Sequence, residues 1–370
     1  MSKKILIVGA GITGLALASL LKDKDVNVTI IDKATSINQP GYGLTVMPSG
    51  LDVLSKLGLV PAVRKLGTSA RNIQVITPQK GILKTFDLAD SGVDSVTVNR
   101  ADLHKLLGRH FGVKNIQFST TITSLDELGQ GVDVTFSDGT TKNFDMVVGA
   151  DGINSIVRSL IFPDNKAKYT GAAIWSLTLP KRYWKDGPQT VKTVWGDERF
   201  MGIFPIKAGA AVAFSMPLDP SIRPSTVDLA SAFKDLSPDV ARFIREAKDG
   251  DIYASHLRNI TLDHWYKGNV VLAGDAAHAM MPSTGMGGSI GLQDADVLAD
   301  LILATPQHLL HTVAKRYEKV CKPQANANQK QAFSVGKMML AKGLKLAVRD
   351  AIMPLLPKNS LSRMVVAAKQ

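Results

Sequence analysis

The stretch Ile5-Leu6-Ile7-Val8-Gly9-Ala10-Gly11-Ile12-Thr13-Gly14 begins as an apolar strand and breaks into the pattern G-x-G-x-x-G. In this pattern Gly9 permits a tight turn, Gly11 lets the backbone approach a pyrophosphate, and Gly14 lets strand and helix pack closely. A helix is expected over residues 15–21, and its first N–H groups and positive dipole end would face the phosphates. The stretch therefore predicts a nucleotide-binding turn.

A second strand is expected over residues 26–31 and ends at Asp32, eighteen positions after Gly14. An acid at this distance is placed to accept hydrogen bonds from an adenosine ribose. The order of strand, glycine turn, helix, strand and acid predicts a site for an ADP-containing dinucleotide.

With 370 residues, the chain can bury a large core and form two connected lobes. No segment has the ~18 uninterrupted apolar residues of a membrane span. The N-terminus superficially resembles a signal peptide, but Gly9, Gly11 and Gly14 interrupt its apolar run where a nucleotide site needs them. The single cysteine, Cys321, excludes an intramolecular disulfide framework and a thiolate metal cluster, which favours a reducing cytoplasm.

The formal net charge is +12, and residues 334–370 carry half of that excess. Such a charge suits an anionic substrate, an anionic membrane surface or a nucleic acid. No zinc-finger spacing or aromatic–basic motif accompanies it, which argues against a nucleic-acid partner. The basic residues of this segment, opposed only by Asp350, are Lys337, Lys342, Lys345, Arg349, Lys358, Arg363 and Lys369.

The middle of the chain alternates between strand and helix patterns. Residues 71–99 look like strands with turns at Pro78 and Gly92, and a helix is expected over residues 101–111 after Arg100. Two further strands are expected around a turn at 129–131. Residues 170–216 read as strands bounded in part by Gly187, followed by helices over 226–236 and 238–248 and a buried strand over 269–273. The pattern predicts a discontinuous dinucleotide lobe with an inserted sheet.

Two later segments are expected to meet the first glycine turn at one ligand. One is the strand end Asp151-Gly152 with Ser155 and Arg158, and the other is Gly274-Asp275 followed by the glycine-rich loop 282–288. Asp275 can hold a sugar-like hydroxyl, and loop glycines let the backbone pass close to a flat ring. If that ring is an isoalloxazine, the helix from Ser289 stabilises negative charge at N1–C2=O.

In order and spacing, these segments resemble the flavoprotein monooxygenases of the p-hydroxybenzoate hydroxylase type, which include tetracycline-modifying and salicylate hydroxylase-like members. The resemblance runs from about residue 4 to residue 325 and includes Arg100 with Leu103. It implies an α/β fold: a Rossmann-like FAD-binding domain (1–75, 100–167 and 258–333), an inserted β-sheet substrate domain (76–99 and 168–257) and a C-terminal helical segment (334–370).

By this resemblance, Asp32 binds the ADP ribose, Asp275 the ribityl chain or pyrophosphate, and Arg100 the FAD from the side. Asp151-Gly152 would serve FAD and the nicotinamide cofactor. The cofactor contacts implied in all are Gly9, Gly11, Gly14, Asp32, Lys33, Gly43, Leu44, Arg100, Asp151, Gly152, Gly274, Asp275, Pro282, Gly285, Met286, Gly287, Gly288 and Ser289.

The resemblance also implies the chemistry. NADPH or NADH reduces FAD, O2 adds at flavin C4a, and the hydroperoxide hydroxylates an aromatic or polycyclic small molecule without a metal. No catalytic base is assigned. Where the family commonly has Glu, Gln and Arg, this chain has Asp32, Met286 and Ser176. The alternatives are a reductase or dehydrogenase on the same scaffold, and a flavin-binding protein without turnover.

The substrate side of the site is predicted from aromatic and methionine residues in the inserted sheet. Trp175, Phe200, Phe204 and Met216 are candidate pocket walls, although such residues at strand spacing are more often ordinary core. His278 is expected to cap the Gly274-Asp275 turn rather than to catalyse. A small aromatic substrate and O2 are the expected partners, and the chain is expected to be a monomer or a dimer.

The basic tail allows two interpretations. Taken as one helix over 334–352, it places Leu340, Leu344, Ala347, Val348 and Ala351 on one face and Lys342, Lys345 and Arg349 roughly opposite. The helix could clasp both lobes with its apolar face, or lie on a membrane surface and give access to a lipophilic substrate. We favour the clasp, because Pro354 and Pro357 keep the helix short.

Overall fold

The computed structural model describes residues 2–37, 42–88, 94–128, 131–183, 189–247 and 252–357. The turns expected at Gly92 and Gly187, most of the turn at 129–131, and residues 358–370 lie outside these ranges.

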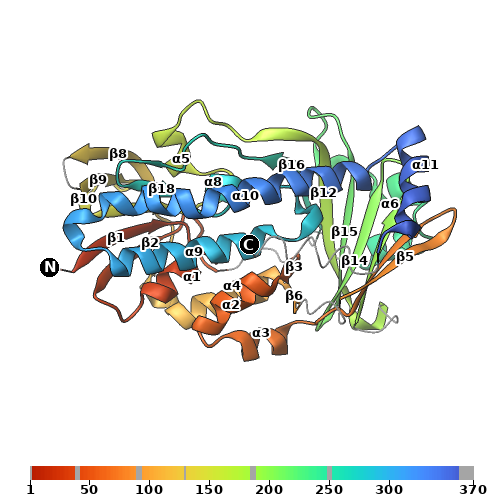
Figure 1. Ribbon diagram of the computed structural model, residues 1–370, viewed down its shortest axis with the longest axis horizontal. Coiled ribbons are helices and arrows are strands. Elements are labelled where there is room, and N and C mark those ends of the chain that lie inside the picture. Colours follow the sequence, from red (N-terminus) through yellow and green to blue (C-terminus); the bar gives the residue numbers. More distant parts are fainter. Residues whose placement is uncertain are drawn as a thin grey trace.

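A six-stranded sheet at one end of the molecule carries the nucleotide-binding turn (Figure 1). Two of its inner strands, Met146–Gly149 and Val270–Leu272, are wholly buried and apolar, as expected for strands covered on both faces. Its spatial order is β17 (Tyr266–Lys267), β18 (Val270–Leu272), β11 (Met146–Gly149), β1 (Lys3–Val8), β2 (Val26–Ile31) and β7 (Ile116–Gln117). Only β17 runs antiparallel to its neighbour.

Helices and a second sheet pack on this sheet. The helices of this layer are α1 (Ile12–Leu21), α4 (Arg100–Phe111) and α9 (Gly287–Ala304), while α2 (Pro48–Lys56) packs on α9, and α3 (Val60–Leu66) packs on α2 and α4. The three-stranded sheet consists of β8 (Ile122–Leu128), β9 (Gly131–Phe136) and β10 (Thr141–Phe144). The short helices α5 (Ile156–Ile161) and α8 (Asp275–His278) follow β11 and β18 directly. Their apolar side chains form one continuous core.

A seven-stranded sheet forms the other end of the molecule (Figure 1). Its order is β16 (Tyr253–Asn259), β12 (Lys168–Pro180), β15 (Gly209–Pro217), β14 (Phe200–Ile206), β13 (Thr190–Trp195), β4 (Asn72–Thr77) and β5 (Gly81–Asp87). One face packs against α6 (Leu229–Phe233) and α7 (Val240–Glu246), which are shorter than the helices expected there. A separate core lies between them.

Two elements join the ends. The small pair β3 (Gly43–Val46) and β6 (Val96–Asn99) lies between the two large sheets, and α10 (His311–Met339) runs along the long axis (Figure 1). The observed architecture confirms the predicted α/β class with a Rossmann-like domain and an inserted sheet. The domain boundaries remain a prediction. In the described part of the chain, no helix is long and apolar enough to cross a membrane.

The C-terminal helix differs from the expectation. The chain does not form one helix over 334–352, because α10 ends at Met339 and α11 (Gly343–Ile352) begins after a break. Gly343 has φ +54°, a left-handed conformation that suits glycine and interrupts the helix. The expected clasp by the apolar face is also wrong, since Leu344 and Val348 face solvent and Arg349 is buried.

Candidate active site

Backbone atoms pack closely against two glycines of the first glycine turn. Gly9 has φ +106°, and a Cβ there would meet the Ala150 carbonyl oxygen at 2.5 Å. A Cβ on Gly14 would lie 2.0 Å from the Gly9 carbonyl oxygen. Both glycines are therefore required by the protein itself, as the sequence pattern predicts.

Gly11 is different, because nothing in the protein requires a glycine there. Its φ is −74°, and a Cβ would meet no atom closer than the Ala150 carbonyl oxygen at 4.0 Å. It stands directly before α1, whose first N–H groups lack intrahelical partners. A glycine kept open at a helix N-terminus fits the close approach of a pyrophosphate. By this test the turn fits FAD.

Two side chains hold Ala10, the residue between the first two glycines. The Ala10 N–H donates to Asp32 Oδ2 at 2.7 Å, while Asp32 Oδ1 accepts from the Ala34 N–H at 2.8 Å. His104 Nε2 lies 2.6 Å from the Ala10 carbonyl oxygen. Burial lowers the pKa of His104, so the neutral ring donates this hydrogen bond. Asp32 thus lies beside the turn as expected.

The Gly274-Asp275 turn rests on a buried acid of α9. Asp294 Oδ2 accepts from the Gly274 N–H at 2.7 Å and lies 2.6 Å from His278 Nε2. The Asp275 side chain is exposed to solvent. The protein atoms around it still displace part of its water, and this desolvation raises the pKa of Asp275, against the charges of His278 and Arg100, which lower it. His278 has the structural position expected of it.

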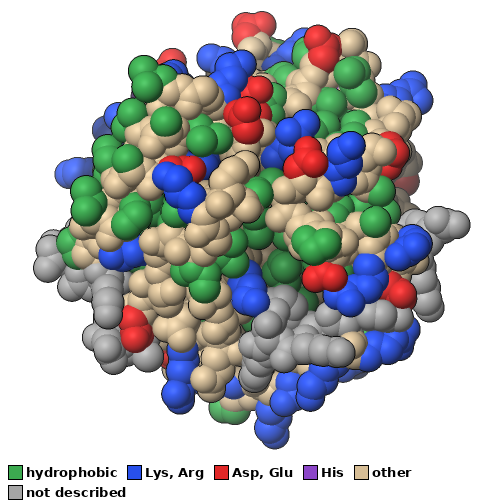
Figure 2. All heavy atoms as spheres, turned by 90° about the vertical axis from the view of Figure 1, so that its right-hand side faces the viewer, with side chains coloured by type: hydrophobic (Ala, Val, Ile, Leu, Met, Phe, Trp, Pro, Cys, Tyr) green, Lys and Arg blue, Asp and Glu red, His purple; other side chains and the backbone are tan. Residues whose placement is uncertain are grey.

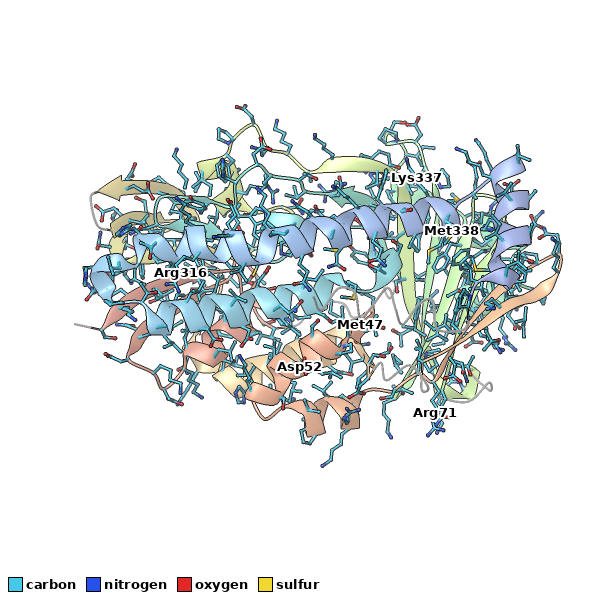
Figure 3. All side chains as sticks on the ribbon, in the orientation of Figure 1. Met47, Asp52, Arg71, Arg316, Lys337 and Met338 are labelled. Carbon is cyan, nitrogen blue, oxygen red and sulfur yellow. The ribbon has the colours of Figure 1, made fainter. Side chains whose placement is uncertain are left out.

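The glycine loop after this turn lies against β3. A Cβ on Gly288 would meet Leu44 Cδ1 at 2.9 Å, and Ser289 Oγ accepts from the Met47 N–H at 2.9 Å. Figure 3 shows Met47 where the start of α9 approaches the seven-stranded sheet. A Cβ on Gly287 would meet nothing closer than Met280 Cγ at 3.8 Å, so this glycine leaves the loop open. The structure thereby brings the predicted cofactor contacts Gly288 and Ser289 together with Leu44 of β3, another predicted contact.

Arg100 reaches the junction between the two ends. Asn99 caps α4 by accepting from the Ala101 N–H at 2.9 Å, which places Arg100 at the helix start. Its guanidinium carbon lies 5.5 Å from the centre of the Tyr42 ring, a cation–π distance. Tyr42 in turn packs against Tyr253 of β16, with ring centres 5.3 Å apart and ring planes tilted by 38°. Burial raises the pKa of Tyr42, which keeps its hydroxyl neutral.

The Asp151 carboxylate accepts hydrogen bonds from the backbone of the same segment. Its Oδ2 accepts from the N–H groups of Ile156 and Val157 at 2.7 and 3.2 Å, so it helps to cap α5. Its Oδ1 is buried without a hydrogen-bond partner among the described residues, and burial raises the pKa of the carboxyl. Arg158 donates to the Ala276 carbonyl oxygen at 3.0 Å, which ties this segment to the Gly274-Asp275 turn.

The remaining predicted cofactor contacts differ in their exposure to solvent. The Lys33 and Pro282 side chains are exposed, and Met286 is buried in the core beside the start of α9. A Cβ on Gly152 would meet nothing within 4 Å.

The four predicted pocket residues separate onto opposite faces of the seven-stranded sheet. The rings of Phe200 and Phe204 both lie over Gly202, on the face that also meets Gly43 through Ala211. Trp175 and Met216 lie on the other face, against α6 and its core. Trp175 is buried there and donates to the Pro224 carbonyl oxygen at 2.8 Å. Only the two phenylalanines therefore lie on the side of the glycine loop.

Sequence reasoning missed three residues that shape the site: Tyr42, His104 and Asp294. Asp294 offered a usable signal, because it is a single acid at helical spacing from the apolar residues Ile290 and Leu298. An acid on a buried helix face needs a partner. Tyr42 and His104 gave no comparable signal.

Comparisons with known proteins agree with this geometry. The family model described as "FAD binding domain" matches residues 2–332. The chain belongs to this family. It is an FAD-dependent monooxygenase of the aromatic hydroxylase type.

Two curated relatives and two solved structures illustrate the likeness. A 3-amino-4-hydroxybenzoate 2-monooxygenase of Streptomyces cremeus is 29% identical, over 87% of this chain and 84% of the relative. A 2-heptyl-3-hydroxy-4(1H)-quinolone synthase of Pseudomonas aeruginosa is 29% identical, over 82% and 81%. Klebsiella pneumoniae HpxO, complexed with FAD and uric acid, shares the fold with a TM-score of 0.88, 21% identity and coverage of 99% and 97%. Tetracycline destructase Tet(55) has a TM-score of 0.77, 23% identity and the same coverage.

Proposed function

We propose that this enzyme uses NADPH or NADH and O2 to hydroxylate an aromatic or polycyclic small molecule. The observation that carries the proposal is the position of the glycine loop and β3 against the sheet face that bears Phe204. A cofactor ring lying along Gly287 would then be reached from the face of the inserted sheet.

The chain's own residues would bind and orient FAD. The glycine turn with Asp32 would hold the ADP part, Asp275 the ribityl chain or pyrophosphate, and the N-terminus of α9 the ring. When bound, FAD accepts a hydride from NAD(P)H and, once reduced, activates O2 for oxygen transfer. Lys33, Arg100 and Asp151-Gly152 remain proposed contacts.

The sheet face itself supports an aromatic substrate. Three of its hydroxyl groups bind backbone carbonyl oxygens: Ser176 donates to Val212 at 3.1 Å, Ser215 to Ala173 at 2.8 Å and Thr193 to Gln74 at 3.0 Å. Beside the half-buried Thr178, this face carries small residues and the rings of Phe200 and Phe204, which suits a flat apolar ring.

The printed names of relatives narrow the class. One is named 6-hydroxynicotinate 3-monooxygenase and another 3-amino-4-hydroxybenzoate 2-monooxygenase, so each name describes a ring with a hydroxyl or amino group. We propose the same kind of ring here, since such groups supply the electron density that oxygen transfer to a ring needs.

The test is an absorbance spectrum of the purified protein, followed by NADPH and NADH titration in air with a panel of hydroxy- and amino-arenes. We expect oxidised-flavin bands, faster flavin reduction with one compound, and a product that has gained one oxygen. Substrate-independent, slow NAD(P)H oxidation with every compound would instead support a flavin-binding protein without turnover. Reduction of the compound without oxygen gain would support a reductase.

Phe204→Ala tests the location of the substrate. We expect KM for the active compound to rise about tenfold while FAD content stays that of the wild type. Phe333→Ala is the matched control, because Phe333 is a partly exposed aromatic residue on α10. Equal KM values in both variants would place the substrate elsewhere.

We also propose a cellular location, an oligomeric state and a membrane contact for this enzyme. We propose a cytoplasmic location, which the single cysteine, Cys321, supports because it is free and buried. A monomer or dimer is proposed for the assembly. A peripheral membrane contact through the basic C-terminal segment also belongs here.

A further inference from the structure

Helix α11 is attached to the protein by its polar side. Arg349 and Asp350 are buried and form an ion pair, with Nε to Oδ1 at 2.8 Å. Arg349 Nη2 also donates to the Trp195 carbonyl oxygen at 3.1 Å, and its guanidinium carbon lies 5.7 Å from the Trp195 ring centre. Met353 adds an apolar contact to the same cluster. These contacts fix which side of α11 faces outward.

The outward side is apolar. Leu344 is 81% exposed, Val348 47%, Ile352 50% and Leu355 80%. Spacings of four, four and three residues put them in one stripe along the helix and the turn that follows it. We call these four residues the apolar stripe. Exposed apolar residues scattered singly are ordinary, but a contiguous row indicates a binding surface.

A neighbouring strand adds to this end of the molecule. Ile82 of β5 is 57% exposed, and Lys84 Nζ donates to the Pro354 carbonyl oxygen at 3.0 Å, which joins β5 to the end of the apolar stripe. Figure 1 shows β5 and α11 together at this end, and Figure 2 shows green side chains on this face interspersed with blue lysine and arginine and with red acidic side chains.

The charges around the stripe are mainly positive. Lys80, Lys337 and Lys345 are exposed, and Figure 3 shows Lys337 at the end of α10 beside the sheet. Among the described acids, Glu198 pairs with Lys342 at 3.1 Å and Asp350 with Arg349, while Asp197 is exposed. The partner must therefore accept both apolar side chains and positive charge.

An anionic lipid surface meets both requirements. An in-plane amphipathic helix buries its apolar face at the headgroup boundary while lysines contact anionic headgroups. A second copy of this chain fits less well, because each copy carries a net charge of +12 and would bring its own lysines to the contact.

We propose that the apolar stripe of α11, with Ile82 and the surrounding lysines, docks this enzyme on an anionic membrane surface. The inference names the membrane partner of the proposed function, but vesicle binding needs no turnover. A failure here would leave the monooxygenase assignment intact, and an inactive enzyme could still bind vesicles.

The test is co-sedimentation of the FAD-loaded full chain with vesicles of phosphatidylglycerol and phosphatidylcholine, compared with phosphatidylcholine alone. We expect binding to the anionic vesicles that weakens at 0.5 M salt, where the Debye length falls to about 4 Å. The double variant Leu344→Gln/Leu355→Gln should bind about tenfold more weakly or not at all. It should keep wild-type FAD content and thermal stability, because both side chains are already exposed.

Val320→Gln is the matched control, since Val320 is an equally apolar residue, 59% exposed, on α10 and outside the stripe. It should bind vesicles as the wild type does. Equal binding by the double variant and the wild type would overturn the proposal, as would a wild-type chain that stays in the supernatant. A dimer that the double variant converts to monomer, without vesicle binding, would assign the stripe to self-association instead.

Discussion

Asp294 Oδ2 lies 2.6 Å from His278 Nε2, in a contact where both side chains are at most 2% exposed. The same oxygen accepts the Gly274 N–H at 2.7 Å, at the turn that presents Asp275. Burial lowers the pKa of His278, but the charge and hydrogen bond of Asp294 outweigh it, so the net pKa is raised. An acid on α9 therefore holds the turn that carries one of the proposed FAD contacts.

Asp294→Asn should destabilise the protein strongly. Breaking a buried ion pair leaves the other group unpaired at a cost of about 3–5 kcal/mol. The measurement is the free energy of unfolding in urea, with FAD content determined on the same samples. Asp296→Asn is the control two residues along α9, because Asp296 pairs with the partly exposed Lys56 at 2.6 Å. Its expected cost is about 0–1 kcal/mol. An equal loss of unfolding free energy in both variants would show that the buried contact stabilises the protein no more than the exposed one.

His104 should give the protein a stability that is lost in acid. Its pKa is lowered on folding, so its contribution is present above the ordinary value of about 6.5 and disappears as the pH falls through the folded-state pKa. His104→Gln can still donate to the Ala10 carbonyl oxygen but does not titrate. The loss of unfolding free energy between pH 7.5 and pH 5.5 should therefore be smaller in His104→Gln than in the wild type. The same pH dependence in both proteins would contradict this.

The leucine variant separates the hydrogen bond from the charge. His104→Leu leaves the buried Ala10 carbonyl oxygen without its donor, which should cost about 1–3 kcal/mol at pH 7.5. His104→Gln should cost less at that pH. Urea unfolding of both variants measures the difference.

Gly11→Ala and Gly14→Ala should fail for different reasons. The alanine Cβ at position 14 would lie 2.0 Å from a backbone oxygen, so the fold itself must shift. At position 11 nothing lies closer than 4.0 Å, so the apoprotein should keep its wild-type Tm. FAD binding should nevertheless weaken at least about tenfold, measured by fluorescence titration, because the methyl group occupies the approach to the pyrophosphate. Wild-type FAD affinity in Gly11→Ala would refute the assignment of this turn.

The sequence predicts well those parts of the fold that depend on local patterns of apolar residues and glycines. The strand before Gly9, the helix after Gly14 and Asp32 at the next strand end follow from periodicity and glycine placement. Asp32 consequently lies beside the expected turn.

The parts that escaped prediction depend on which face of an element meets which neighbour. Strand alternation puts Trp175 and Phe204 on opposite faces of one sheet but does not say which face meets the glycine loop. The amphipathic pattern of α11 is present, yet the buried Arg349–Asp350 pair turns its apolar face outward. Both outcomes require the tertiary structure.

Cys321 should be unreactive in the native protein. Its side chain is 8% exposed, and burial, with the nearby charge of Asp294, raises the pKa of the thiol well above its ordinary value. The thiolate is the reactive form, so both access and ionisation oppose modification. A disulfide reagent such as 5,5′-dithiobis(2-nitrobenzoate) at pH 8 should label no thiol in the native state and one per chain in urea. Rapid labelling of the native chain would contradict this prediction. It would show that the region where α10 meets Asp294 opens to solvent.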